Sequence, residues 1–526
     1  MNELLAADLA ALRPELWLTG AILAALVADL VCGRRFPRLS GLLCLAGVGG
    51  ALLHLPGVRE WIDCRLSLFG FDCCDGASIS AEPMRVMGLL VLDGPAHFFR
   101  TLIIAATGFV VLAALVFRRG GQDTTARGEF PAMLLTAAVG GCLLVSADHL
   151  LMLFLGMEML SLPSYVLAGW RKSDRRSSEA ALKYLVYGAL ASGLMVFGFS
   201  LIYGLSGSLW LSDAAVGLFT AWESGSGEAH AAVVLAVTLV LAGIGFKIAA
   251  FPFHFWAPDV YEGAPTPVTA MLAVASKAAG FGVLLRFTGT VFLGGEAISV
   301  DWLERFSWML AVLAAVTMTY GNITAVLQRN VKRLLAFSSI AHAGYLLMGV
   351  AVMTRGFTPE RSNEALGLDA TLFYLATYYV ATLGAFGCVL SLSHRFGAEE
   401  TDDYNGLGWS APWTGAALVV FLVSLTGLPP TLGFIGKLVL FKAALSSGLA
   451  WLAVVAALNA VVALFYYFKL ARALFLRGER SFVPGQRERG LLAVVAHASI
   501  LLFAIATVWY GLFWDGIAEW VARSLG

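Results

Sequence analysis

Apolar runs, each long enough to cross a lipid bilayer as a helix, follow one another along most of this chain. The hydrocarbon core of a bilayer is ~30 Å thick, and about 20 apolar residues in a helix span it. Because lipid offers no hydrogen-bond partner, a spanning segment must satisfy its own backbone, as a helix does. The sequence therefore predicts an all-α polytopic membrane protein. We count about fourteen runs by this criterion, near residues 15–33, 39–57, 96–117, 129–147, 150–170, 178–205, 230–255, 266–290, 302–324, 333–353, 367–393, 412–445, 448–473 and 490–514.

Composition supports this fold class and narrows the function. Hydrophobic residues make up 59% of the 526 residues, charged residues 13%, and the mean hydropathy is +0.80. A formal net charge of +0 gives nucleic acids and acidic partners no electrostatic attraction. We expect no removable signal peptide, since the first residues lack a basic segment followed by a small-residue cleavage site. The seven cysteines lack the spacing typical of iron–sulfur, haem or zinc ligands, so we expect no cofactor and no metal in this chain.

Basic residues cluster after odd-numbered runs, which sets the expected orientation. Cytoplasmic loops of membrane proteins carry an excess of lysine and arginine. We therefore place these loops in the cytoplasm and both termini on the outer side. The clusters are Arg34, Arg35 and Arg38; Arg118, Arg119 and Arg127; Arg171, Lys172, Arg175 and Arg176; Arg329, Lys332 and Arg333; and Arg477, Arg480, Arg487 and Arg489.

Residues 58–92 are expected to form an outer loop that contains three cysteines. Alternating residues in Arg65–Phe71 indicate a short strand there. In an oxidising compartment, a disulfide between Cys64 and either Cys73 or Cys74 would close a hairpin. Three free thiols are the alternative, and the sequence does not decide between them.

The stretch Gly243–Gly280 combines features that an ordinary spanning helix lacks. Lys247 precedes Pro252, and Lys277 lies in the next apolar run. Proline has no N–H to donate and its ring crowds the preceding turn, so we expect the helix to kink or open at Pro252. Open backbone in a membrane is tolerated only where it is buried in protein or lines a wet cavity. A lysine at bilayer depth costs about 3 kcal/mol on insertion scales. We interpret the stretch as part of an ion path.

A faint internal repeat accompanies a second interruption. The pentapeptide Tyr165–Gly169 (YVLAG) recurs as Tyr345–Gly349 (YLLMG), and Pro429 and Pro430 interrupt the twelfth run. An odd number of runs separates the corresponding members, which requires the two copies to be inverted in the membrane. Inverted repeats with interrupted helices are typical of transporters, whose sites lie near the middle of the bilayer.

Ionisable residues within the runs are the candidates for ion transfer. A buried lysine titrates more readily than an arginine does. We predict that Glu158 and Lys247 lie at a similar depth and act as a pair, in which the carboxylate keeps the amine protonated. A purely structural ion pair is the alternative. Lys277 and Lys437 lie too deep for their amines to reach the interface, which favours a functional role.

Other polar residues in the runs leave two interpretations open. Lys183 lies nearer the cytoplasmic end of its run, so both transfer and snorkelling are compatible with it. His254 and His342 are either relay groups or satisfied polar side chains. Asp259 and Glu262 are expected to cap the loop after the seventh run.

Three motifs together carry a resemblance to a known family. They are FPFHFWAPDVYEGAPTPVTAMLAVASKAAG, KRLLAFSSIAHAGYLLMG and LTGLPPTLGFIGKLVLFKA. With them, nearly the whole chain resembles the antiporter-like membrane subunits of proton-pumping NADH:quinone oxidoreductase, or respiratory complex I. It is most similar to the subunit N type, since subunit M usually carries a glutamate where Lys437 stands.

The resemblance implies a fold and a role for several residues. It implies fourteen helices containing two inverted five-helix repeats, with breaks in helices seven and twelve. Glu158 and Lys247 would form the coupling pair, Lys277 the central relay and Lys437 the station toward the exit. Lys183 matches a lysine on the sixth helix of subunit N. The implied domains are residues 1–125 (helices 1–3), 126–300 (first repeat), 301–480 (second repeat) and 481–526 (helix 14).

The resemblance also implies where the chemistry and the partners lie. Flavin mononucleotide, iron–sulfur clusters and quinone would belong to partner subunits, and this chain would move protons in response to quinone reduction elsewhere. The expected neighbours are subunits M, K, J, A and H in a bacterial plasma (inner) membrane, with both termini periplasmic. A subunit of an Mrp-type cation/proton antiporter and one of a membrane-bound hydrogenase are alternatives of the same ancestry. A scaffold that pumps nothing is the further alternative.

Overall fold

The computed structural model describes most of the chain. The described residues are 2–32, 36, 38–56, 58, 83–117, 128–293, 300–355, 357–358, 361–362, 364–476 and 490–524. The strand predicted in Arg65–Phe71 and the cysteines Cys64, Cys73 and Cys74 lie outside these ranges. The four cysteines within them, Cys32, Cys44, Cys142 and Cys388, are free thiols.

The described chain is almost entirely helical. The first half contains α1 (Asn2–Ala11), α2 (Arg13–Cys32), α3 (Leu39–Leu53), α5 (Gly94–Val116), α6 (Glu129–Ser146), α7 (Leu150–Ala168), α8 (Arg175–Ser206), α9 (Leu211–Glu223), α10 (Gly227–Ile248), α11 (Trp256–Gly263), α12 (Thr266–Met271), the π-helix η2 (Leu272–Ser276), α13 (Lys277–Thr288) and the π-helix η3 (Gly289–Leu293). The second half contains α14 (Val300–Val326), α15 (Val331–Arg355), α16 (Glu364–Phe396), the 3₁₀-helix η4 (Thr401–Tyr404), α17 (Leu407–Ser410), α18 (Pro412–Thr426), α19 (Leu432–Ser446), α20 (Ala450–Leu476), α21 (Leu491–Leu512) and α22 (Asp515–Arg523).

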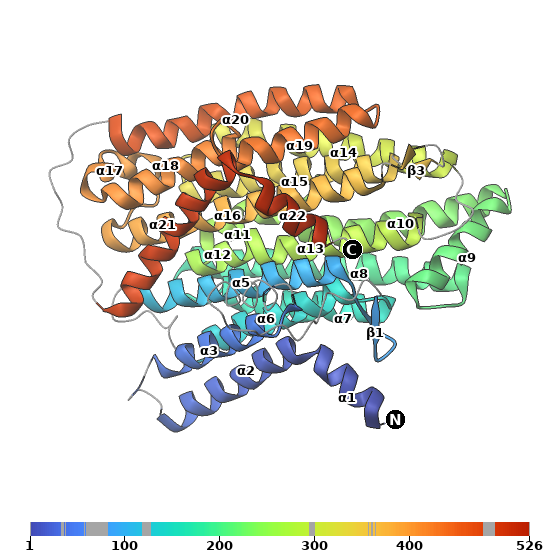
Figure 1. The fold of residues 1–526 in the computed structure, drawn as a ribbon, viewed down its shortest axis with the longest axis horizontal. Helices are drawn as coiled ribbons and strands as arrows, with labels where there is room; N and C mark the ends of the chain where they lie inside the picture. The colour runs from blue at the N-terminus through green and yellow to red at the C-terminus, as the bar shows by residue number, and fades with distance from the viewer. Residues whose placement is uncertain are drawn as a thin grey trace, which may run out of the picture.

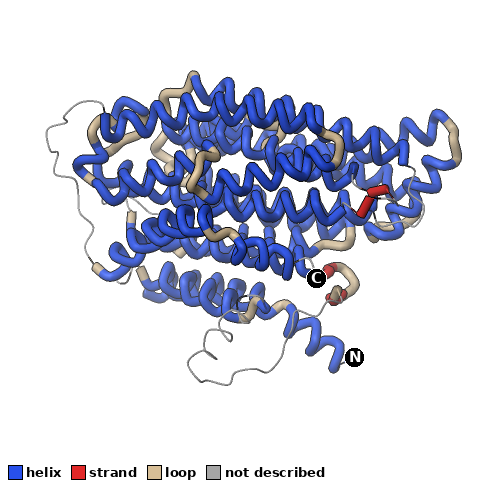
Figure 2. Tube along the Cα trace, turned by 45° about the horizontal axis from the view of Figure 1, so that its top comes forward, coloured by secondary structure: helices blue, strands red, loops and turns tan. Residues whose placement is uncertain are grey.

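Two short antiparallel hairpins accompany the helices among the described residues. In the first, β1 (Met84–Val86) pairs with β2 (Leu90–Leu92), so that Arg85 faces Val91. In the second, β3 (Phe357–Thr358) pairs with β4 (Arg361–Ser362). Figures 1 and 2 both place the two hairpins at the same end of the helix bundle.

Membrane-spanning helices account for most of this architecture. Twelve helices in the described ranges are long and apolar enough to cross a membrane. Two more apolar runs form shorter helices, Leu39–Leu53 and Pro412–Thr426. The second of these is short because the run at 412–445 divides into α18 and α19 at Pro429 and Pro430. The chain is a multi-pass, all-helical membrane protein, and the predicted fold class is confirmed.

The helices differ sharply in how much neighbouring protein covers them. In Figure 1, α2 and α3 run along one edge of the bundle and α20 along the opposite edge, while α21 crosses obliquely. The spans Thr266–Leu293 and Val331–Arg355 are 100% buried over their apolar windows, and the α16 span is 94% buried. The corresponding fractions are 22% for α2 and 39% for α20. Residues 266–293, α15 and α16 therefore form the centre of the molecule, away from lipid.

One buried and one partly buried ion pair join the amino-terminal helices to this centre. Arg100 on α5 donates to both carboxylate oxygens of Glu15 on α2, at 2.8 and 2.6 Å. Arg286 on α13 pairs with Asp93, the residue that caps α5, at 2.8 Å. Removing one partner of the buried Glu15–Arg100 pair leaves a buried charge uncompensated, which typically costs about 3–5 kcal/mol. These pairs fix the register of α2 and α13 against α5.

Candidate functional site

The first interruption of the helical backbone lies directly after Lys247. Helix α10 ends at Ile248, Ala249 adopts a left-handed conformation with φ of 56°, and α11 begins only at Trp256. The indole N–H of Trp256 donates to the carbonyl of Phe246 at 3.0 Å, and the N–H of Ala250 donates to that of Gly245 at 2.9 Å. The carbonyls of Gly245 and Phe246 therefore keep partners inside the protein, as burial in a membrane requires.

Lys247 is buried in the last turn of α10, beside α7. Its side chain is 2% exposed, and Nζ donates to Oγ of Ser161 on α7 at 2.9 Å. Glu158 lies one turn before Ser161 and accepts a hydrogen bond from Oγ of Ser192 on α8 at 2.5 Å. The ion pairs of the described residues do not include Glu158 with Lys247. Lys247 therefore contacts α7 one turn after Glu158, and its amine binds Ser161 rather than the carboxylate.

Lys277 occupies the centre of the molecule, where a π-helical turn ends and α13 begins. Nζ of Lys277 donates to Ser339 on α15, at 2.5 Å to the carbonyl oxygen and 2.6 Å to Oγ. Tyr378 on α16 donates to the same Oγ at 2.8 Å. Single π-turns within helices are frequent at functional sites because they shift side chains out of the regular register. Ser339 thus connects a lysine and a tyrosine from two different helices.

His342 extends the polar contacts from Lys277 deeper into the second half of the chain. Nδ1 of His342 lies 2.6 Å from the hydroxyl of Tyr374, and Nε2 lies 3.3 Å from that of Tyr467. Tyr467 also hydrogen-bonds Ser338, the neighbour of Ser339. The His342 ring is 5.0 Å from the ring of Tyr378. His342 is therefore held by two hydroxyls and packs against the tyrosine that contacts Ser339.

The second interruption places the amine of Lys437, on α19, against the carboxyl end of α18. Helix α18 ends at Thr426, Gly427 has φ of 87°, and α19 begins at Leu432 after Pro429 and Pro430. Nζ of Lys437 donates to the freed carbonyls of Thr426 and Leu425 at 2.7 and 3.2 Å. The negative end of the helix dipole favours a cation there.

An aromatic ring connects Lys437 to the histidine. Nζ lies 4.7 Å from the ring centroid of Tyr345, within the range of a cation–π contact. The Tyr345 ring is in turn 5.9 Å from the His342 ring. The contacts that begin at Lys277 therefore continue through His342 and Tyr345 to Lys437.

Lys183 lies apart from Lys247, Lys277 and Lys437. It is 38% exposed and pairs with Asp259 on α11 at 2.5 Å and with Glu179 at 2.8 Å. Asp259 also pairs with Arg333 on α15 at 2.5 Å, and Arg333 contacts Glu262 at 3.1 Å. Burial acts to raise the pKa of the Asp259 carboxyl, but hydrogen bonds from Lys183 and Arg333 outweigh it and hold the pKa below its usual value. Asp259 and Glu262 thus bind α8 and α15 to α11, which is more than the loop cap that we expected.

His254 is buried in the first interruption but is not connected to the buried lysines. It is 1% exposed, and neither ring nitrogen has a hydrogen-bond partner within the described ranges. Its ring packs against Phe251 at 5.5 Å and Tyr320 at 4.4 Å. Of the two histidines, the structure therefore brings only His342 into contact with the other candidate groups.

Several polar residues of this site were missed in the sequence. Tyr374 and Tyr378 lie four positions apart and share one face of α16, and Ser338 and His342 share one face of α15 in the same way. That spacing could have indicated a polar face shared by the two helices. Tyrosine, however, is common in apolar helices, and packing of its ring is enough to explain why it is buried. Ser161 and Ser192, which bind Lys247 and Glu158, carried no recognisable signal.

Comparisons with known proteins place the chain in a family. Residues 147–463 match the family model described as NADH:quinone oxidoreductase/Mrp antiporter, TM. The NADH-quinone oxidoreductase subunit N of Chlorobium chlorochromatii (strain CaD3) is 40% identical over 521 residues, covering 97% of this chain and 93% of the relative. The chain belongs to the NADH-quinone oxidoreductase subunit N family. The predicted resemblance is confirmed.

Solved structures agree with membership of the subunit N family. A chain of respiratory complex I from Thermus thermophilus with bound aureothin is 31% identical, with a TM-score of 0.74, and the match covers 97% of this chain and 99% of that one. A chain of the Mrp complex from Dietzia sp. DQ12-45-1b has a TM-score of 0.77 at 23% identity, covering 98% of this chain and 97% of that one. At that identity the Mrp likeness concerns the fold alone, so the subunit N relatives are the nearer of the two kinds.

Proposed function

We propose that this subunit N family member translocates protons as part of the membrane arm of an NADH:quinone oxidoreductase. Protons would move along a row of buried side chains in mid-membrane, driven by quinone reduction elsewhere in the complex. The groups assigned to the row are Glu158, Lys247, Lys277, His342 and Lys437.

The observation that carries the proposal is the unbroken series of contacts between Lys277 and Lys437. It passes through Ser339, Tyr378, His342 and Tyr345. All of these side chains lie on the helices that protein covers most fully or on the interrupted helix beside them. Polar and ionisable groups are expensive at this depth, and a row of them through the centre of a membrane protein typically marks an ion or proton path.

The driving reaction is assigned to partner subunits. Flavin mononucleotide, iron–sulfur clusters and quinone would reside there, and the partners would be subunit M and the small subunits K, J, A and H. Glu158 is only partly covered within this chain, whereas Lys247, Lys277 and Lys437 are buried. This exposure supports Glu158 as the group through which a neighbouring subunit acts on Lys247.

The proposal also assigns the chain an orientation in the membrane and divides it into two inverted repeats. The chain would lie in a bacterial inner membrane with both termini periplasmic. Residues 126–300 and 301–480 would form the two inverted repeats. Lys247 lies at the carboxyl end of the half-helix α10, and the amine of Lys437 on α19 binds the carboxyl end of the half-helix α18, which supports the correspondence. Lys183 is proposed to anchor α8 to α11 through Asp259 at the cytoplasmic entrance.

Purification of the tagged chain from its native membranes tests this function. The proposal predicts that NADH:quinone reductase activity, flavin and iron–sulfur clusters co-purify with it, and that NADH drives proton uptake into reconstituted vesicles. Cation/proton exchange without NADH oxidation would instead show an Mrp-type antiporter. Hydrogen evolution by the purified assembly would show a membrane-bound hydrogenase.

A further inference from the structure

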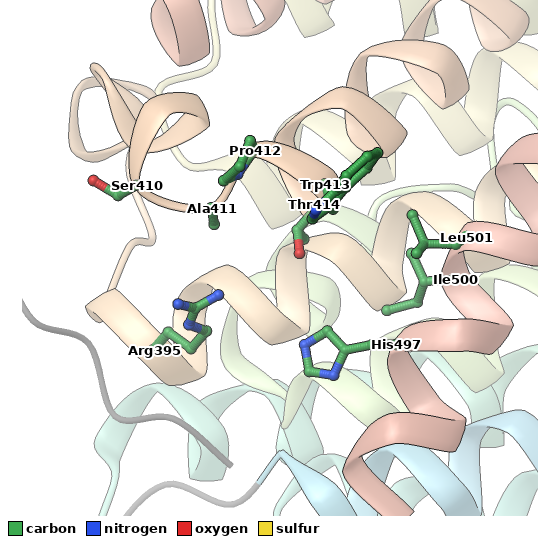
Figure 3. A pocket seen from close by; sticks show the side chains of 9 residues that line it. All are labelled: Arg395, Ser410, Ala411, Pro412, Trp413, Thr414, His497, Ile500 and Leu501. Carbon is green, nitrogen blue, oxygen red and sulfur yellow. The ribbon is translucent and has the colours of Figure 1, made fainter. Parts of the chain in front are cut away.

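A cavity at the end of the bundle opposite the two hairpins is not part of the row of buried lysines. It has a volume of about 360 Å³ and lies where α16 ends and α18 begins, beside α21. Figure 3 shows Arg395 and His497 projecting from α16 and α21 toward the turn at Ser410–Thr414, with Ile500 and Leu501 on the same side of α21 as His497. In the predicted orientation this end of the bundle is cytoplasmic.

The cavity is positively charged and lacks an acidic side chain among its lining residues. Nε of Arg395 is buried and donates to no acceptor within the described ranges. The guanidinium stacks over the Phe396 ring at 5.1 Å. The only other titratable lining group, His497, has its Nδ1 committed to the carbonyl of Ala493 at 2.8 Å and its Nε2 3.3 Å from Oγ of Ser391.

The start of α18 adds to the positive potential. Helix α18 begins at Pro412, and its N-cap residue Ala411 supplies no side-chain acceptor to the first-turn N–H groups. The positive end of the helix dipole therefore lies at the cavity that Arg395 also lines. The hydroxyls of Ser410 and Thr414 line the same region. A guanidinium together with hydroxyls and free N–H groups is suited to a phosphate, which arginine binds in a bidentate manner.

The walls of the cavity are apolar and lead to lipid. Ile500 and Leu501 belong to α21, whose neighbouring residues Leu502 and Ile505 are 63% and 64% exposed. Trp413 at the mouth is 75% exposed, and tryptophan is enriched at membrane interfaces. A free anion would gain no favourable contact from this apolar wall. A phospholipid would place its phosphate at Arg395 and its acyl chains along α21.

We propose that the cavity between Arg395, the amino end of α18 and α21 binds one anionic phospholipid of the cytoplasmic leaflet. Its volume falls within the ~300–1,000 Å³ range of small-molecule sites. Basic pockets between membrane helices on the cytoplasmic side recognise anionic head groups in this way. The lipid would hold the amino end of α18, the half-helix whose far end binds Lys437.

Lipid retention by the full chain tests the site without measuring proton transfer. The purified chain is reconstituted in phosphatidylcholine alone, in phosphatidylcholine with phosphatidylglycerol, and in phosphatidylcholine with inorganic phosphate. After transfer to detergent, native mass spectrometry counts retained lipids, and the unfolding midpoint is recorded. The wild-type chain should retain phosphatidylglycerol and unfold at a higher temperature in that mixture only.

Four variants complete the test. Arg395→Gln should weaken phosphatidylglycerol retention about ten-fold, the effect of losing a charge-assisted hydrogen bond, while Arg395→Lys should keep part of it. Leu501→Trp should fill the cavity and reduce retention without a change of charge, which keeps the test valid if Arg395→Gln fails to fold. Arg472→Gln, at an exposed arginine on α20 outside the cavity, should retain the lipid like the wild type.

Three results would overturn the proposal. One is wild-type retention in both Arg395→Gln and Leu501→Trp. Another is equal stabilisation by inorganic phosphate, which would make the cavity a free-anion site. The third is a loss of stability in Arg395→Gln that is the same in every lipid, which would reduce Arg395 to a cation at the carboxyl end of α16.

Discussion

The three lysines of the proposed row, Lys247, Lys277 and Lys437, share one chemical feature, which is that their hydrogen-bond acceptors are neutral oxygens. Lys247 binds a serine hydroxyl, Lys277 a serine carbonyl and hydroxyl, and Lys437 two backbone carbonyls. In the described part of the chain none of the three forms an ion pair. A protonated amine held only by neutral groups can give up its proton without stranding a buried anion. This distinguishes the three from Lys183, which two carboxylates hold.

The Glu158–Lys247 pair is tested by a double-mutant cycle. Glu158→Gln and Lys247→Ala should each impair proton pumping and coupled quinone reduction in the assembled enzyme. Because Lys247 binds Ser161, which lies one turn after Glu158 on α7, the combined effect of the two changes should be smaller than the sum of the single effects by about 0.5–3 kcal/mol. Fully additive losses in activity would show that the carboxylate does not act on this amine.

The hydroxyl of Tyr378 is tested against that of its neighbour. Tyr378→Phe removes the hydrogen bond to Ser339 beside Lys277 and should slow pumping about five-fold, the effect of losing roughly 1 kcal/mol. Tyr379→Phe is the matched control, since the Tyr379 hydroxyl is buried without a partner in the described structure. Pumping rates in vesicles that fell equally in both variants, or in neither, would remove Tyr378 from the path.

At the scale of helices, the sequence predicts the two interruptions from local chemistry, but it does not predict which side chains meet between helices. Pro252, Pro429 and Pro430 remove N–H donors from their own segments, so the sequence alone indicated where α10 and α18 end. The partner of Lys277 is Ser339, 62 residues away, and which face of α15 turns toward α13 depends on how whole helices pack. For the same reason the run lengths predicted the spans but not that Asp259 would join α8 to α15.

The ionic contacts of α11 make a prediction at this scale. Asp259→Asn should lower the unfolding midpoint of the purified chain by about 2 °C, since partly exposed pairs contribute about 1 kcal/mol to a large protein. Glu179→Gln is the control, because Glu179 contacts Lys183 on its own helix and joins no second element. A thermal scan in which both variants unfold together would show that α11 does not depend on Asp259.

For the whole molecule, the orientation in the membrane decides which end of the row receives protons. The turn at Lys172 and the turn at Gly225 precede and follow α8 and α9, at opposite ends of the bundle. A reporter fused after Lys172 should therefore be active in the cytoplasm, and one fused near Gly225 should be active outside. The opposite pattern of reporter activity would reverse the orientation and exchange the entry and exit ends.

The proposed proton path is tested most directly by replacing Lys437 and measuring the ratio of protons pumped to electrons transferred. Lys437 is the last station of the proposed row, and in that role it would have to both accept and release a proton. Lys437→Met should leave the assembled complex intact on native gels and lower the ratio in reconstituted vesicles. Lys437→Arg should be poor as well, because arginine does not release its proton.

Lys442→Met is the matched control, since Lys442 is exposed on the same helix, little more than one turn further along α19. We expect a normal proton-to-electron ratio for Lys442→Met and a reduced one for both Lys437 variants. A normal proton-to-electron ratio in Lys437→Met would contradict the proposed path.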